Sequence, residues 1–86
     1  MKNQSPKTSH VKVDLSFLAE KWPSAIVSRD QVGNFTGGMI STKRMANLDS
    51  LGEGPKEGVL RCGNRKIAYV VNPFLRWLET RMSLVR

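Results

Sequence analysis

Apolar and polar residues alternate on both sides of a Gly-Asn pair in the C-terminal third of the chain. A period of two is typical of β-strands, and a Gly-Asn pair between two such runs is a recognised hairpin signal. A two-residue turn at Gly63-Asn64 also predicts the register of the hairpin. The predicted pairs are Cys62 with Arg65, Arg61 with Lys66, and Leu60 with Ile67.

The same alternation divides the predicted hairpin into an apolar face and a basic face. The residues expected on the apolar face are Leu60, Cys62, Ile67 and Tyr69. Those expected on the opposite face are Arg61, Lys66 and Ala68. Cys62 is accordingly interpreted as a buried small hydrophobe rather than as a nucleophile. Because an isolated hairpin of this size is marginally stable in water, helices are expected to pack against it.

A helix is predicted from residue 42 to about residue 50. Ser41 is a favourable N-cap residue, and Gly52 supplies the C-terminal stop. Helical spacing turns Met45 and Leu48 inward. The side chains left on the outside are Thr42, Lys43, Arg44 and Asn47.

A shorter helix is predicted before it, because Ser28 and Gln31 have the spacing of a capping box. Gly33 and the pair Gly37-Gly38 interrupt the helical pattern, so this helix must be short. Phe35 is expected to fill the core beside it.

The last predicted helix follows the hairpin. Asn72 is expected to cap it and Pro73 to occupy its first position. Its inward stripe is predicted to be Phe74, Leu75, Leu78 and Met82.

Residues 1–22 are predicted to form an arm that precedes a domain of residues 23–86. Residues 1–10 are polar and expected to be disordered. Residues 11–17 alternate between apolar and polar, as in a strand. Asp14 could instead cap a helix over residues 15–21, and the helix is slightly favoured. Trp22 is expected to pack on the core, with a role in self-association as the alternative.

The charge of the chain indicates a polyanionic partner. Its 86 residues include 14 Lys and Arg against 7 Asp and Glu, which gives a formal net charge of +7. On one small domain this charge favours nucleic acid first and an acidic membrane surface second. No apolar run reaches the length of a membrane-spanning helix. Nucleic acid is therefore retained as the expected partner, and no membrane is included among the partners.

The residue types argue against an enzyme or a metal protein. Cys62 and His10 are the only cysteine and histidine, so neither an intramolecular disulfide nor a tetrahedral zinc site is expected. No Ser-His-Asp set and no phosphate-binding glycine motif is present. We therefore expect no catalytic residue, no metal and no cofactor, and a reducing cytoplasmic location.

The order helix, glycine turn, helix, loop, basic hairpin, helix predicts a small α+β winged helix-turn-helix domain. Its second helix would enter the major groove of duplex DNA, and its hairpin would form the wing that grips phosphates or the minor groove. The candidate DNA-binding residues are Thr42, Lys43, Arg44, Asn47, Arg61, Asn64, Arg65 and Lys66.

Several residues of the predicted recognition helix have alternative interpretations. Lys43 and Arg44 alternatively provide only solvent-facing charge, and Thr42 alternatively serves only at the helix start. Asn47 alternatively hydrogen-bonds to the glycine loop. Asp49 repels phosphate, so it is expected to point away from DNA or to pair with a neighbouring cation.

The chain resembles the excisionase and AlpA-like group of proteins in residues 41–49, 52–55, 60–69 and 74–79. The more specific pieces are the Gly-x-Gly-Pro loop at 52–55 and the closing Trp-Leu-Glu at 77–79. The group consists of small winged-helix proteins related to the DNA-binding part of MerR regulators. The chain departs from the group's pattern in the Gly37-Gly38 segment and in the long segment before the first predicted helix.

The resemblance implies a DNA-architectural or regulatory protein of a phage or an integrated element. Such proteins bind short repeated sites, often cooperatively, and bend DNA so that an integrase excises, or they regulate transcription of an integrase gene. The partners implied are double-stranded DNA, an integrase or other recombinase, and further copies of the chain on DNA.

Two other classes of function are the alternatives. A small basic chain equally fits an RNA-binding protein, and residues 11–22 would be the contact surface of a protein-interaction adaptor. RNA binding is the weaker of these hypotheses because the aromatic residues are expected in the core instead of on a base-stacking surface. These residues are Trp22, Phe35, Tyr69, Phe74 and Trp77.

Overall fold

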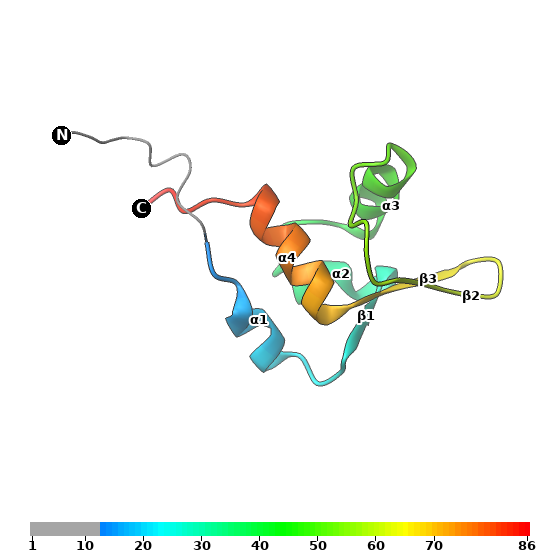
Figure 1. Cartoon of the computed structure of the whole chain (residues 1–86), viewed down its shortest axis with the longest axis horizontal. Coiled ribbons are helices and arrows are strands. Elements are labelled where there is room, and N and C mark those ends of the chain that lie inside the picture. The colour runs from blue at the N-terminus through cyan, green and yellow to red at the C-terminus, as the bar shows by residue number, and fades with distance from the viewer. Residues whose placement is uncertain (1–12) are drawn as a thin grey trace.

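A computed structural model describes residues 13–86 of the chain (Figure 1). This part is a small α+β fold in which helices pack around a three-stranded antiparallel sheet. The expectations for residues 1–12 lie outside the described residues. The elements in chain order are α1 (Ser16–Lys21), β1 (Ile26–Ser28), the 3₁₀ turn η2 (Arg29–Gln31), α2 (Val32–Phe35), α3 (Thr42–Ser50), β2 (Val59–Cys62), β3 (Lys66–Val70) and α4 (Val71–Arg81).

The sheet has the strand order β1-β3-β2, so the hairpin is extended by a strand that the sequence pattern did not predict. In β1, Val27 pairs with Tyr69, and both side chains are fully buried. Three residues are too few to show an alternating pattern on their own. β1 is defined by its pairing with β3, about 40 residues away along the chain.

The predicted register of the hairpin is wrong by one residue. Cys62 pairs with Lys66 instead of Arg65, so that Gly63, Asn64 and Arg65 form a three-residue loop, with Gly63 at a φ of 69°. Because side chains alternate between the faces of a sheet, a shift of one residue moves one strand's whole pattern to the other face. The register is consistent with the burial of Tyr69, which faces the core opposite Val59.

Cys62 is exposed, which corrects its predicted burial. Lys66 is its cross-strand partner, so both side chains lie on the face of the sheet opposite to Tyr69. The correct register also separates the two residues expected to share the basic face. Arg61 pairs with Ile67, on the Tyr69 side of the sheet, whereas Lys66 projects from the other side.

The predicted start of α3 is confirmed, because the Ser41 hydroxyl accepts a hydrogen bond from the Arg44 amide at 3.0 Å. Met45 and Leu48 are buried as predicted, and Gly52 ends the helix with a φ of 76°. The capping box at Ser28 is wrong. Ser28 is a residue of β1 and makes no side-chain cap, and the Gln31 side chain instead accepts from the side-chain Nδ2 of Asn34.

The predicted start of the last helix is also wrong by about two residues. β3 runs directly into α4, whose N-cap is Val70, so Asn72 and Pro73 lie inside the first turn. The Val71 amide donates to the Ala25 carbonyl at 2.9 Å, and this bond fixes the end of β3 beside β1. The inward residues Phe74, Leu75 and Leu78 are buried as predicted.

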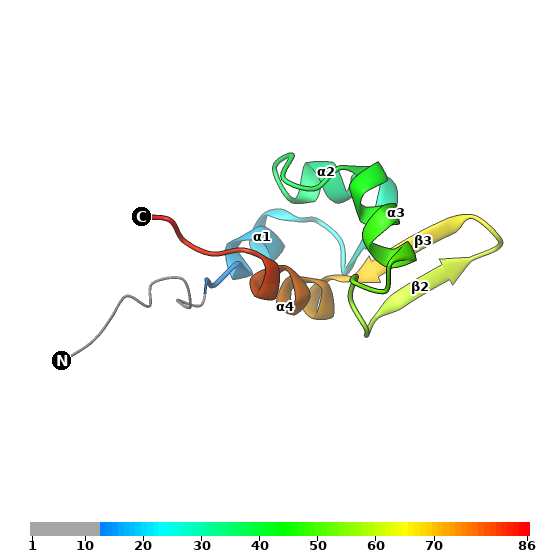
Figure 2. The same ribbon diagram turned by 90° about the horizontal axis from the view of Figure 1, so that it is seen from above.

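The N-terminal part of the fold contains the helix that the sequence slightly favoured. α1 begins one residue later than predicted, and the Asp14 carboxylate accepts from the Ser16 amide at 2.9 Å. Leu15 is buried, and its amide donates to the Glu79 carboxylate of α4 at 2.8 Å. α1 is thereby attached to α4, at the end of the molecule away from the hairpin tip (Figures 1 and 2).

The core is built on a connected series of aromatic rings. Phe74 lies at its centre, with ring centroids 4.9 Å from Tyr69, 5.5 Å from Trp77 and 5.7 Å from Phe35. Trp22 meets Phe35 edge to face at 5.3 Å. The prediction that these five aromatic residues belong to the core is therefore confirmed, with the two tryptophans at its edge.

The loop after α3 passes close to the side chain of Asp49, and this contact generates a testable prediction. A Cβ atom at Gly54 would overlap Asp49 Oδ1 and come within 3.1 Å of its Cγ. We expect Gly54→Ala to lower the free energy of unfolding by about 1–3 kcal/mol, because the carboxylate or the loop must shift. Urea unfolding followed by circular dichroism measures this change.

Gly33→Ala is the matched control. A Cβ there meets only the Ile40 carbonyl oxygen, at an ordinary 3.9 Å. Alanine also favours the helix α2, so this variant should be neutral or slightly stabilised. Equal effects of the two substitutions would contradict the proposed role of the Gly54 contact.

Candidate nucleic-acid interface

The outer face of α3 presents polar side chains to solvent. Lys43 and Asn47 are exposed and lie one helical turn apart, opposite the buried Met45 and Leu48. The Asn47 side chain makes no hydrogen bond to any other group within residues 13–86. Its alternative role, a hydrogen bond that supports the glycine loop, is therefore not observed. Both side chains are therefore available to a ligand.

Thr42 and Arg44 lie on the flanks of α3. The Thr42 hydroxyl is 3.5 Å from the Asp30 carbonyl oxygen, at the long limit for a hydrogen bond, and the residue is exposed. Arg44 lines a small cavity of about 160 Å³ with Arg81 and Met82 of the C-terminal region. Arg44 therefore lies toward the C-terminal region, at the side of the outer face that Lys43 and Asn47 occupy.

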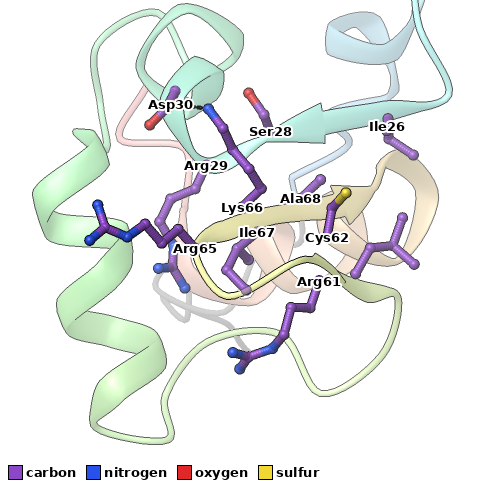
Figure 3. Close-up of a pocket in the computed structure, with 11 residues that line it drawn as sticks. Ile26, Ser28, Arg29, Asp30, Arg61, Cys62, Arg65, Lys66, Ile67 and Ala68 are labelled. Carbon is purple, nitrogen blue, oxygen red and sulfur yellow. Dashed lines mark ion pairs between the residues drawn. The ribbon is translucent and has the colours of Figure 1, made fainter.

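All four hairpin candidates are exposed, but they point in different directions. Figure 3 shows Arg65 extending from the loop toward α3, and Arg61 extending from the opposite side of the hairpin. Lys66 reaches Asp30 of η2, with 3.6 Å between the charged atoms. Asn64 lies in the loop between the strands, so the hairpin offers polar groups on both faces and at its tip.

A partly buried hydrogen-bonded cluster of Arg29, Asp49 and Tyr69 joins α3 to the sheet. Tyr69 donates to Asp49 Oδ2 at 2.5 Å, and Arg29 Nη2 donates to the same oxygen at 2.6 Å. Arg29 Nε also donates to the Tyr69 hydroxyl at 3.0 Å. This cluster holds the C-terminal half of α3 beside the base of the hairpin, where Figure 2 shows them side by side.

The cluster shows which of the two expectations for Asp49 holds, and it contains Arg29, a residue that the sequence did not identify. Asp49 does pair with a neighbouring cation, and that cation is Arg29, 20 residues earlier in the chain. No local motif identifies Arg29 as the partner, because the pairing depends on how η2 packs against α3. The sequence indicated only that Asp49 needs a cationic partner, because it is the single carboxylate on a helix with exposed cations.

Ion pairing elsewhere leaves the candidate residues largely unneutralised. The ion pairs within residues 13–86 join Arg29 to Asp49, Lys66 to Asp30, Arg76 to Glu57, and Arg81 to Glu53. Of the five candidate cations, Lys43, Arg44, Arg61 and Arg65 are in none of these pairs. The positive charge of α3 and the hairpin therefore faces solvent.

Burial and the bond to Asp49 raise the pKa of Tyr69 to about 12, with burial as the larger cause. Burial alone would lower the pKa of Arg29, but its bonds to Tyr69 and Asp49 outweigh that effect and raise the pKa. Both shifts favour the neutral phenol and the charged guanidinium that the cluster requires.

Within the described part of the chain, no three His, Cys, Asp or Glu side chains are grouped as metal ligands. None of the helices in residues 13–86 has the length and apolar character needed to cross a membrane. Comparisons with protein-family models, curated proteins and solved structures found no match to this chain. The resemblance to the excisionase and AlpA-like group therefore rests on the sequence motifs alone.

The cluster predicts the titration behaviour of the one tyrosine in the chain. The pKa of Tyr69 is raised from 10.0 in the unfolded chain to about 12 in the fold, so folding favours the protonated phenol. Its contribution to stability is full below pH 10 and is lost as the pH rises toward 12. Phenolate absorbance, measured in the native protein and in urea, should give two well-separated midpoints.

An Asp49→Asn variant tests the cause of this shift. Removing the carboxylate should bring the native midpoint of Tyr69 closer to its ordinary value, because a negative charge beside a phenol opposes its ionisation. Coincident native and unfolded midpoints in the unmodified protein would show that the cluster does not form.

Proposed function

We propose that this protein binds duplex DNA in a sequence-specific manner as a winged helix-turn-helix domain without catalytic activity. The observation that carries the proposal is the unneutralised charge of two adjacent elements. Lys43 and Arg44 on α3, and Arg61 and Arg65 on the hairpin, have no carboxylate within ion-pairing distance among residues 13–86. Such unneutralised basic charge on a small domain suits a polyanion.

In the proposed mechanism, α3 enters the major groove. Lys43 can donate to guanine acceptors, and Asn47 can form a bidentate pair with adenine. Lys43 lies in the first turn of the helix, the part that contacts bases in helix-turn-helix proteins, and Asn47 follows one turn later on the same face. Thr42 and Arg44, on the flanks of the helix, are assigned to the phosphates beside the groove.

The hairpin is proposed to act as the wing. Arg61, Arg65 and Lys66 would contact the phosphate backbone or the minor groove, and Asn64 would accompany them at the tip. The cluster of Arg29, Asp49 and Tyr69 would fix the angle between this wing and the recognition helix. Phosphate contacts of this kind provide most of the affinity, whereas α3 provides the sequence preference.

The finer proposal follows from the sequence resemblance. It is that the protein is an excisionase that bends DNA to direct an integrase, with AlpA-like transcriptional regulation as the alternative. Further copies on DNA and an integrase are the proposed protein partners, at the bacterial nucleoid. RNA binding is less well supported, because the five aromatic residues considered as stacking surfaces belong to the core.

Selection of bound duplex fragments from the source genome tests the proposal. Binding at about 150 mM salt suppresses weak phosphate-only association. Recovery of a few repeated sites beside an integrase gene or attachment site would support the excisionase proposal. Unselective recovery would argue against base readout by α3, and a preference for RNA would favour the alternative class.

Arg65 is predicted to contribute one phosphate contact. Arg65→Ala should weaken binding to every duplex sequence and lower the slope of log affinity against log salt by roughly 0.9, the value for one released counterion. Fluorescence anisotropy over a salt series measures this slope. Lys21→Ala, which removes the same charge from α1 far from the hairpin, is the control and should leave the slope unchanged (Figure 1).

Asn47 is predicted to read a base. Asn47→Ala should cost about 1–3 kcal/mol at the selected site and reduce the preference over unrelated duplexes. Ser50→Ala, on the same outer face but one turn nearer the C-terminus, is the control and should have little effect. If the Asn47 variant lost the same affinity on all sequences, its role in base readout would be excluded.

A further inference from the structure

The outer face of the sheet has a hollow over its central strand. Ser28 of β1 and Leu60 of β2 are the two cross-strand neighbours of Ala68, so a small side chain lies in the middle of this row (Figure 3). The resulting cavity has a volume of about 220 Å³. Sites for drug-sized ligands have roughly 300–1,000 Å³, so this cavity fits a single inserted side chain better than a small-molecule cofactor.

Apolar residues flank the hollow and are not covered by the rest of the fold. Ile26 and Leu60, from the two edge strands, are 42% and 43% exposed, and the exposed Cys62 lines the same cavity. Exposed aliphatic side chains grouped around a hollow are typical of binding sites, whereas scattered ones are ordinary. The inserted side chain should therefore be apolar.

The charge at the rim of the hollow defines the rest of the ligand. Arg65 and Lys66 line the cavity, whereas the Arg61 side chain projects from the Tyr69 side of the sheet. The one carboxylate among the lining residues is Asp30, which is 66% exposed and already paired with Lys66. Carboxylates beside the inserted apolar group would thus find two cations, Arg65 and Lys66, at the rim of the hollow.

We infer that the outer face of the sheet binds an acidic protein segment that inserts one apolar side chain over Ala68. Its carboxylates pair with Arg65 and Lys66. Nucleic acid phosphates would satisfy these cations but leave the hollow unfilled, whereas an acidic, apolar-anchored segment satisfies both. This docking does not require DNA binding; the consequence that the segment competes with DNA for the hairpin cations rests on the proposed function.

Cys62 allows occupancy of this site to be measured directly. It is the only cysteine in the chain, it is exposed and it lines the cavity. The probe is a short labelled peptide with one phenylalanine flanked by aspartates and glutamates. Its binding is followed by anisotropy, and the rate of Cys62 alkylation by iodoacetamide is measured with and without saturating peptide. Bound peptide is expected to slow alkylation.

Two control peptides separate the apolar and charged parts of the inference. In one, serine replaces the phenylalanine, and in the other, asparagine and glutamine replace the acids. Each should bind at least about tenfold more weakly than the probe, because each lacks one of the two interactions. Equal binding of the serine peptide would reduce the site to non-specific electrostatics and overturn the inference.

Two variants of the protein test the hollow itself. Ala68→Leu fills it and Ile26→Ser removes an apolar wall, and both should weaken probe binding by about tenfold. Val85→Ser makes a comparable change at an 83% exposed position outside the cavity and should have no effect. Circular dichroism checks that each variant is folded. If one of the two variants does not fold, the other still tests the hollow.

Duplex DNA provides the last arm of the experiment. DNA affinity should be unchanged in Ala68→Leu and Ile26→Ser, while unlabelled probe peptide should displace DNA from the unmodified protein. Specific probe binding without any DNA binding would refute the proposed function and leave the docking site standing. Absence of probe binding, or binding that leaves Cys62 alkylation unchanged, would overturn the docking site and leave DNA binding untouched.

Discussion

The Asp49 carboxylate is the group on which the arrangement of the fold most depends. One of its oxygens accepts from both Tyr69 and Arg29, and thereby joins α3, β3 and the turn after β1. A partly buried carboxylate without these donors would be costly, so the three elements are energetically coupled. The same carboxylate restricts the following loop, because Gly54 passes too close to it for any side chain.

This coupling has a consequence for the proposed interface. Asp49 is the one acid on α3, and its pairing with Arg29 removes a negative charge from the vicinity of the exposed cations. The other acids in ion pairs neutralise Lys66, Arg76 and Arg81. Lys43, Arg44, Arg61 and Arg65 are in none of these pairs within residues 13–86, so the placement of the carboxylates leaves their positive charge on α3 and the hairpin unneutralised.

The register of the hairpin gives its two faces different characters. One face directs Tyr69 into the aromatic core, and the other combines an apolar hollow with a basic rim. The second face exists only because Cys62 pairs with Lys66, which brings Leu60 opposite Ala68. With the two-residue turn, Leu60 would have pointed toward the core, and no hollow would have formed between the edge strands.

The sequence by itself determined the features whose signals lie within a few residues of one another. Examples are the Ser41 cap of α3, its end at Gly52, the inward faces of α3 and α4, and the existence of the hairpin. Tertiary structure decided the strand β1, the register of the hairpin, the exposure of Cys62 and the partner of Asp49. These depend on contacts between residues about 20 to 40 positions apart, such as Arg29 with Asp49 and with Tyr69. Local patterns contain no information on such contacts, because they form only when the core brings the elements together.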